Sequence, residues 1–199
     1  MEISPEVQDI RIPEHPVHPI FLNRWSPRAF SPEPLSDETV GRLFEAAKWA
    51  ASSYNEQPWR FLVGRTPEDH ARILSVLIPF NQLWAKNAPL LVLSVAKKTF
   101  AHNGTPNRVA VHDVGAASAY LILAATELGL YAHGMAGFDV AAARSVLEIP
   151  DDYEPLAVWA IGHRGNKEDL PPEAQAREAP SPRKSQAEFV FEGKFPAAP

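Results

Sequence analysis

Residues 50–64 read A-A-S-S-Y-N-E-Q-P-W-R-F-L-V-G, and they join an amphipathic helix to an apolar strand through a short polar turn. The polar side chains of this turn are Ser52, Ser53, Asn55 and Gln57. Hydroxyl and amide groups can donate and accept hydrogen bonds to a flat heterocycle without introducing charge. A plain helix C-terminus, which Pro58 prevents from continuing, is the alternative interpretation.

Composition narrows the class of protein. The chain has 199 residues, of which 45% are hydrophobic and 22% charged, enough for one well-buried domain or one lobe of an intertwined dimer. Its net charge of −5 and the lack of a basic stripe argue against nucleic acid as a partner. Cysteine is absent, which excludes disulfides and thiolate sites, so any redox chemistry must come from a cofactor.

The start of the chain carries acids where a signal peptide needs a basic segment and an apolar core, so we expect a mature cytoplasmic protein. The longest apolar runs, near Leu90 to Ala96 and Ala116 to Ala125, are shorter than a membrane span. We therefore expect no membrane partner. We also expect no metal site, because His15 and His18 have no third ligand nearby.

Apolar strands interleaved with helices indicate an α+β or α/β fold in which helices pack on a central sheet. Ser36 begins a helix that leads into the polar turn, and Pro89 to Val95 has the continuous apolar character of a strand buried on both faces. Ala110 to Leu128 predicts a helix that is apolar around its circumference, and we expect it to be central and shared with a partner subunit. Asn81 to Ala88 is interpreted as a polar helix end or loop, and Lys97 to Val109 as a mobile loop.

The two ends of the chain differ from the middle. Residues 1–20 are rich in proline and have no helical or strand period, which predicts an extended N-terminal arm. Residues 166–199 are rich in proline and charge but contain F-V-F and K-F-P, so we expect a tail that wraps around a partner chain. We assign the whole of 1–199 to a single domain with these two extensions.

A second motif lies upstream of the turn, where residues 24–30 read R-W-S-P-R-A-F. Arg24, Ser26 and Arg28 place two guanidinium groups and a hydroxyl close together, a combination that suits a phosphate or the polar edge of a ring. On local chemistry alone, a solvated surface turn is the alternative.

A third motif, G-M-A-G-F-D at residues 134–139, follows a short expected strand, Tyr131 to Met135. Small residues there would let a ligand ring approach backbone N–H groups closely. The alternative is a tight turn in which Asp139 caps the next helix.

Taken together and in this order, the three motifs resemble the nitroreductase-like flavoprotein family, over roughly Phe21 to Phe195. The resemblance implies an α+β fold with a central mixed sheet flanked by helices. It also implies an intertwined homodimer with FMN bound at the dimer interface.

The resemblance also implies a set of cofactor-binding residues. They are Arg24, Trp25, Ser26, Arg28, Ser52, Ser53, Asn55, Gln57, Met135, Ala136, Gly137, Arg183 and Lys184. Arg24 and Ser26 match positions at the FMN phosphate, which the pair Arg183 and Lys184 reaches from the C-terminal segment. Arg28 matches the basic residue at the N1/O2 edge of the flavin, where positive charge stabilises the reduced form.

The other matches concern the flavin ring. Asn55 and Gln57 match amides on the pyrimidine side, and the serines at 52–53 match a turn that lies over the flavin of the partner subunit. At the corner formed by Ala136 and Gly137, a backbone N–H approaches N5. Better-known nitroreductases have an acidic residue at the position of Ala136, a departure that puts substrate and nicotinamide preference in doubt rather than flavin binding.

The function implied is that of an FMN-dependent NAD(P)H oxidoreductase with a ping-pong cycle. NADH or NADPH would reduce the flavin at N5, and a nitroaromatic, a quinone or another small electrophilic acceptor would then take the electrons. Because the cofactor carries this chemistry, no catalytic side chain is assigned. The alternatives are a flavin-dependent dehalogenase or flavin-fragmenting member of the family, and a non-enzymatic flavin-binding protein.

Overall fold

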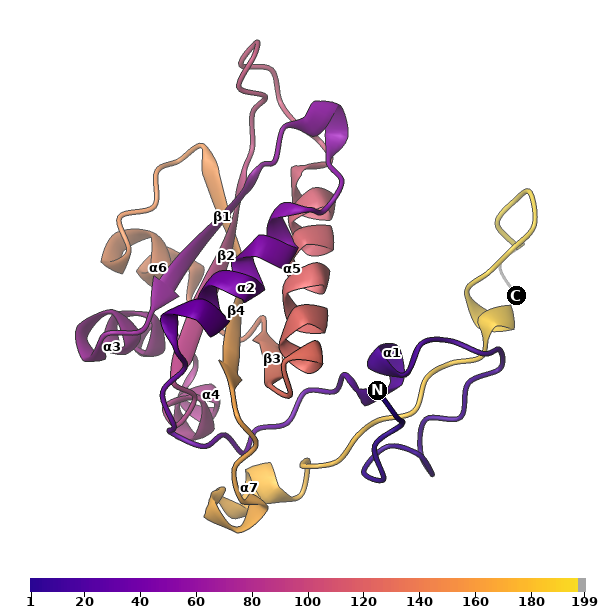
Figure 1. Ribbon diagram of the computed structural model, residues 1–199. Helices are drawn as coiled ribbons and strands as arrows, with labels where there is room; N and C mark the ends of the chain where they lie inside the picture. The colour runs from indigo at the N-terminus through magenta and orange to yellow at the C-terminus, as the bar shows by residue number, and fades with distance from the viewer. Residues whose placement is uncertain (197–199) are drawn as a thin grey trace.

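The computed structural model describes residues 1–196, in which helices and strands alternate along the chain (Figure 1). In chain order the elements are α1 (Pro19–Asn23), α2 (Asp37–Lys48), the 3-10 turn η1 (Ser53–Asn55), β1 (Trp59–Gly64), α3 (Pro67–Ser75), α4 (Pro79–Ala85), β2 (Leu90–Lys97), α5 (Ala110–Glu127), β3 (Tyr131–Met135), α6 (Val140–Val146), β4 (Tyr153–Gly162), η2 (Lys167–Asp169), α7 (Pro172–Gln175) and η3 (Gln186–Glu188).

The four strands form one sheet in the order β1-β2-β4-β3. Within residues 1–196 every pairing between these strands is antiparallel, and Leu93 on β2 lies between Leu62 and Val158. The expected α+β class is confirmed, but the sheet that the described residues form is antiparallel rather than mixed. The order of apolar segments does not contain strand direction, since a helix can connect antiparallel neighbours, as α6 does between β3 and β4.

Helices cover both faces of the sheet, with α2 and α5 on one side and α3, α4 and α6 on the other (Figure 1). Successive side chains of a strand point to opposite faces, so Leu90 and Val92 pack under α2 and α5 while Leu91 and Leu93 pack toward α3 and α4. This two-sided burial explains the continuous apolar run of β2 and confirms the strand predicted there.

Capping side chains set where the helices begin. Ser36 caps α2 by accepting a hydrogen bond from the N–H of Thr39 at 3.0 Å. The interpretation of Asn81 to Ala88 as a polar helix end or loop is correct in that α4 ends at Ala85, but it is wrong about the polar character, since Trp84 is fully buried and Asn81 is 9% exposed. The polar residues of this segment do not indicate a buried helix, although the indole of Trp84 and the amide of Asn81 both face the protein interior.

Helix α5 is buried along one side only. Leu121 and Ala125 are fully buried, while Val111 and Tyr120 are 55% and 45% exposed. The exposed side also carries Gly115 and few charges, so an apolar helix face is left without a partner within the described part of the chain.

The N-terminal arm and the C-terminal tail run beside each other, away from the sheet (Figure 1). The N–H of Gln186 donates to the carboxylate of Glu14, and Arg11 reaches the carbonyl oxygen of Ser181 at 3.3 Å. The short helix α1 begins in the last two residues of the expected arm, and the last three residues of the expected tail, 197–199, lie outside the described residues. No helix within residues 1–196 is long and apolar enough to cross a membrane.

Candidate functional site

A cavity of about 290 Å³ lies where the N-terminal arm, the loop after α1, β3 and the C-terminal tail meet. We call it the arginine cavity. Its lining consists of Arg11, Arg24, Trp25, Ser26, Arg28, His133, Arg177, Ala179, Ser181 and Arg183. Residues more than 150 positions apart in the sequence are thus brought to one place.

The guanidinium groups of this cavity have no carboxylate partners. Within residues 1–196, none of the five arginines that line it forms an ion pair. Arg24 donates to the hydroxyl of Ser26 at 3.2 Å, and Arg11 donates to the carbonyl oxygens of Leu22 and Arg24. These neutral acceptors leave the positive charge uncompensated, which favours an anion.

The pKa values of these groups reflect the same crowding. Burial, followed by the charges of Arg24 and Arg183, lowers the pKa of Arg11 to about 10. Burial and then Arg183 also lower the pKa of Arg24. Each shift means that the charged form is disfavoured in the free protein, so an anion bound here would stabilise the charged forms.

Arg28 has an unused hydrogen-bond donor. Its Nη1 donates to the carbonyl oxygen of Arg177 at 3.0 Å, and its guanidinium lies 6.0 Å from the ring centre of Trp84. Its Nε is buried and has no hydrogen-bond partner within the described residues. A buried donor without a partner is costly, so this atom indicates a missing acceptor.

His133 lines the arginine cavity with an uncharged imidazole ring. Its Nδ1 lies 2.9 Å from the carbonyl oxygen of Pro27, and its ring centre lies 4.6 Å from that of Trp84. Burial is the main cause that lowers its pKa to about 4. At neutral pH the imidazole therefore adds no charge to the cavity and is not in the imidazolium form that acts as an acid.

A buried carboxylate holds the loop that carries Arg28. The carboxylate of Glu178 accepts hydrogen bonds from the backbone N–H groups of Arg28, at 2.8 Å, and of Ala29, at 3.0 Å. It also pairs with Arg164, whose guanidinium lies 4.9 Å from the ring centre of Trp25. The sequence analysis missed Arg11, His133, Arg177 and Glu178, because only the fold brings the arm and the tail together.

The corner at 135–137 lies near the arginine cavity. The carbonyl oxygen of Gly137 accepts from Asn81 Nδ2 at 3.0 Å and from the N–H of Ile78 at 3.1 Å, at the start of α4. In the same first turn of α4, the ring of Phe80 lies 5.2 Å from the guanidinium of Arg177. The N–H of Gly137 makes no hydrogen bond within the described chain, so it is an available donor.

The size of Gly137 is set by its neighbours. A Cβ atom at this position would lie 2.8 Å from atoms of both Asn81 and Ile78, closer than such contacts allow. Ala136 is exposed and Met135 is buried, so at this corner the backbone and the small side chain face outward.

The polar turn at 52–57 lies beside the N-terminal end of α5, while β3, whose His133 lines the arginine cavity, follows the C-terminal end of the helix (Figure 1). The N–H of Ser53 donates to the carboxylate of Asp113 at 3.0 Å, and Asp113 is 4% exposed. Asn55 and Gln57 have φ angles of 54° and 51°, in the left-handed region. Since α5 has 18 residues that rise about 1.5 Å each, the helix is about 27 Å long.

The structure thus groups the candidate residues in two places. Arg24, Trp25, Ser26, Arg28 and Arg183 line the arginine cavity, with the 135–137 corner nearby. The indole N–H of Trp25 is already donated to Glu6 at 2.9 Å. Lys184 lines a neighbouring cavity of about 310 Å³ between arm and tail. Ser52, Ser53, Asn55 and Gln57 are not brought to these groups within one chain.

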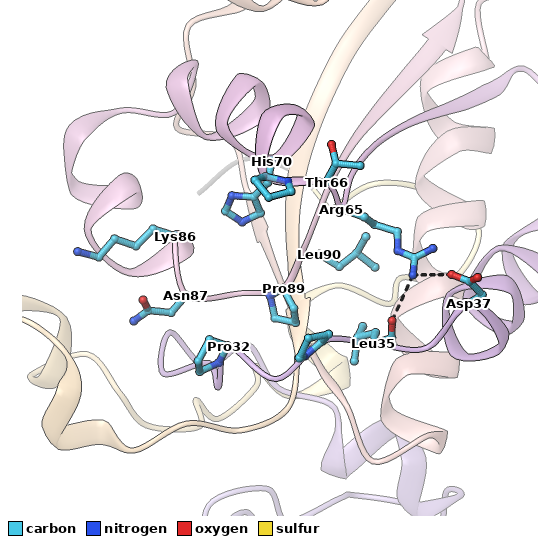
Figure 2. A pocket seen from close by; sticks show the side chains of 12 residues that line it. Pro32, Leu35, Asp37, Arg65, Thr66, His70, Lys86, Asn87, Pro89 and Leu90 are labelled. Carbon is cyan, nitrogen blue, oxygen red and sulfur yellow. Dashed lines mark hydrogen bonds and ion pairs between the residues drawn. The ribbon is translucent and has the colours of Figure 1, made fainter.

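A further cavity, of about 590 Å³, shows a different use of arginine (Figure 2). Arg65 there pairs with Asp37 at 2.7 Å and donates to the carbonyl oxygen of Leu35 at 3.2 Å. His70 Nε2 lies 2.9 Å from the carbonyl oxygen of Ala88. Arg65 therefore has a carboxylate partner, which none of the arginines of the arginine cavity has among residues 1–196.

Several known proteins are similar to this chain in sequence and in fold. The model of the Nitroreductase family matches residues 22–81 and 77–163. A crystal structure described as "the oxidoreductase containing FMN" aligns with a TM-score of 0.89 and 40% identity, over 94% of this chain and 96% of that chain. A Streptomyces coelicolor protein named "Putative NADH dehydrogenase/NAD(P)H nitroreductase" is 31% identical over 172 residues, 77% of this chain and 85% of the relative. A nitroreductase family protein from Clostridium difficile, with a TM-score of 0.69 and 22% identity over 88% of this chain and 97% of that chain, shares the fold.

Proposed function

Because the chain belongs to the nitroreductase family and is an oxidoreductase with FMN as its cofactor, we propose that it passes electrons from NADH or NADPH to a small electrophilic acceptor such as a nitroaromatic or a quinone. One observation carries the proposal for this chain. The arginine cavity gathers five arginines around a space of about 290 Å³, and none of the five forms an ion pair within the described residues.

The groups at this cavity fit FMN. A phosphate dianion would take donors from Arg24, Ser26 and Arg183, which line the same space. The unpartnered Nε of Arg28 suits the pyrimidine edge of the ring, where a fixed positive charge favours the electron-rich form. The free N–H of Gly137 suits a ring nitrogen that needs a donor.

When bound, FMN supplies the hydride-accepting and hydride-donating chemistry. The protein itself would bind FMN, orient its ring and tune its reactivity. The arginines hold the anion, and the two hydrogen bonds that the carbonyl oxygen of Gly137 accepts hold the corner that carries its N–H. His133 stays neutral at physiological pH because its pKa lies at about 4, so we assign it no role in proton transfer.

A homodimer follows from the separation of the two groups of residues. The length of α5, about 27 Å, lies between the polar turn and β3, whose His133 lines the arginine cavity, and this is too far for one FMN molecule to contact both groups within a chain. The exposed apolar face of α5, with Val111 and Tyr120, and the exposed apolar residues of the tail offer surfaces for a second copy. We therefore expect the turn at 52–57 of one subunit to complete the site of its partner.

The testing experiment is an anaerobic visible spectrum of the purified protein before and after adding NADPH and then NADH. The expected result is an oxidised flavin band that bleaches with at least one of the two nucleotides. A band that stays oxidised would contradict the proposed reduction by nicotinamide and favour the dehalogenase or flavin-binding alternatives. A protein that neither carries nor takes up FMN would overturn the proposal.

A further inference from the structure

Two consecutive residues of the tail, Arg177 and Glu178, make hydrogen bonds with Arg28, one to its guanidinium group and one to its backbone. The carboxylate of Glu178 accepts the backbone N–H of Arg28, and the carbonyl oxygen of Arg177 accepts from its Nη1 at 3.0 Å. The backbone and the guanidinium of one residue are thus both fixed by the tail. The Nε, which has no partner in the described chain, is thereby left free for another acceptor.

The carboxylate of Glu178 does not line the arginine cavity, and two of its partners, Ala29 and Arg164, lie outside the lining as well. Its side chain is fully buried, and one oxygen is shared between the N–H of Ala29 and the guanidinium of Arg164. Arg164 in turn lies 3.5 Å from Glu6. Glu178 does not line the arginine cavity, so it can organise the loop without occupying the space of a bound anion.

We propose that Glu178 is a positioning residue for the flavin site and that it acts through Arg28. Its hydrogen bonds to the N–H groups of Arg28 and Ala29 fix the peptide groups on both sides of Arg28, which sets the direction in which the Arg28 side chain leaves the backbone. This inference rests on the proposed function, because FMN is the ligand that Arg28 would meet. It assigns a role to a residue that contacts neither FMN nor an acceptor.

The side chain also favours the charged state of Arg28. Burial lowers the pKa of Arg28, and the nearby carboxylate of Glu178 is the largest influence in the opposite direction. The geometry and the charge of Glu178 therefore both favour a charged Arg28 in one orientation.

The test is a double-mutant cycle on FMN affinity, measured by quenching of flavin fluorescence with the full chain. The variants are Glu178→Ala, Glu178→Gln, Arg28→Ala and the double variants. Glu173→Gln is the matched control, since Glu173 is an exposed acid in α7 of the same tail with no side-chain bond to the described residues. Thermal melting of each variant reports whether it folds.

We expect Glu178→Ala to weaken FMN binding about 30-fold and Glu178→Gln about fivefold, since Gln keeps an acceptor but loses the charge. In the Arg28→Ala background the same changes should weaken binding less than about threefold, because the residue through which Glu178 acts is gone. Glu173→Gln should bind FMN like the wild type. If Glu178→Ala does not fold, the cycle is read from Glu178→Gln, whose shape is the same.

Additive losses would overturn the inference, since they would show that Glu178 supports the fold without acting through Arg28. Unchanged FMN affinity in both Glu178 variants would overturn it as well. In either case a wild-type protein that binds FMN leaves the proposed function standing. A wild-type protein that binds no FMN would overturn both.

Discussion

The arginine cavity and the polar turn at 52–57 are each held by one buried carboxylate, but they differ in what they need to become a site. At the cavity, Glu178 fixes a loop of charged groups that already converge within one chain. At the turn, Asp113 fixes the N–H of Ser53, while Tyr54 beside it is 86% exposed. The cavity is a charged half-site under mutual repulsion, and the turn is a neutral half-site that faces outward.

The difference suggests that the two half-sites contribute in different ways to FMN binding. Guanidinium groups without counter-ions favour an anion wherever it comes from, so the cavity should supply most of the binding energy for FMN. Amides and hydroxyls on an exposed turn contribute little until a second chain presents a ligand to them. We therefore expect changes at the cavity to weaken FMN binding most, and changes at the turn to act through the dimer.

Removal of a cavity arginine should have the largest effect. Arg24→Ala and Arg183→Ala should each weaken FMN binding by roughly 1.5 to 3 kcal/mol, the range for a charge-assisted hydrogen bond. The measurement is a fluorescence titration with FMN. Arg65→Ala is the matched control, because Arg65 lines the separate cavity of Figure 2 and is paired with Asp37. Unchanged affinity in both cavity variants would refute the phosphate assignment.

Acid should weaken the fold at the cavity more than at the turn. The pKa of His133 lies at about 4 in the folded protein against an ordinary value of 6.5, so between these values the unfolded chain binds more protons. The free energy of unfolding should thus fall by about 2 kcal/mol as pH drops from 6.5 to 4. Urea unfolding at several pH values measures this. His133→Gln, which cannot titrate, should flatten the dependence, and an equally steep fall in that variant would assign it to other groups.

Loss of Asp113 should release the turn. Asp113→Ala removes the acceptor for the N–H of Ser53 and should lower the free energy of unfolding by about 1 to 2 kcal/mol, as expected for a buried donor left unpaired. Thermal melting with and without FMN measures both fold and ligand coupling. His112→Ala is the control, since its ring also contacts Asp113 but is exposed. A similar loss in His112→Ala would place the effect in that pair and not in the turn.

Salt should have the smallest effect and should distinguish the two half-sites. Raising the ionic strength from about 0.05 to 0.5 M should weaken FMN binding only several-fold, because partly buried charges are screened less than exposed ones. Riboflavin, which lacks the phosphate, should respond less in the same titration. An equal response of both ligands would argue against a phosphate in the arginine cavity.

The sequence predicted the parts whose signal is local. The three motifs identified the family, which the comparisons confirm, and the periodicity placed α2, β2 and α5. Arg24, Ser26 and Arg28 were predicted to act together, and they line one cavity because they are adjacent in the chain. Arg183 was placed there by the resemblance alone.

The rest depends on long-range contacts that no local pattern contains. Glu178 and Arg177 are ordinary charged residues until the tail lies against the loop at 28–29. Strand direction likewise depends on pairings between strands that are far apart in the sequence. The burial of Trp84 depends on how α4 docks on the sheet, which a pattern of seven residues does not show. Whether the polar turn meets a flavin depends on a second chain and stays a prediction.

The joining of the N-terminal arm to the tail has a consequence for how the protein is made. Arg11 donates to the carbonyl oxygen of Ser181, 170 positions later, so the arginine cavity depends on a contact of very high sequence separation. A ribosome delivers every strand of the sheet before it delivers residues 177–183. During synthesis the chain can therefore build its core first and complete its anion site last, because Arg177 and Arg183, which line the cavity, follow β4 in the sequence.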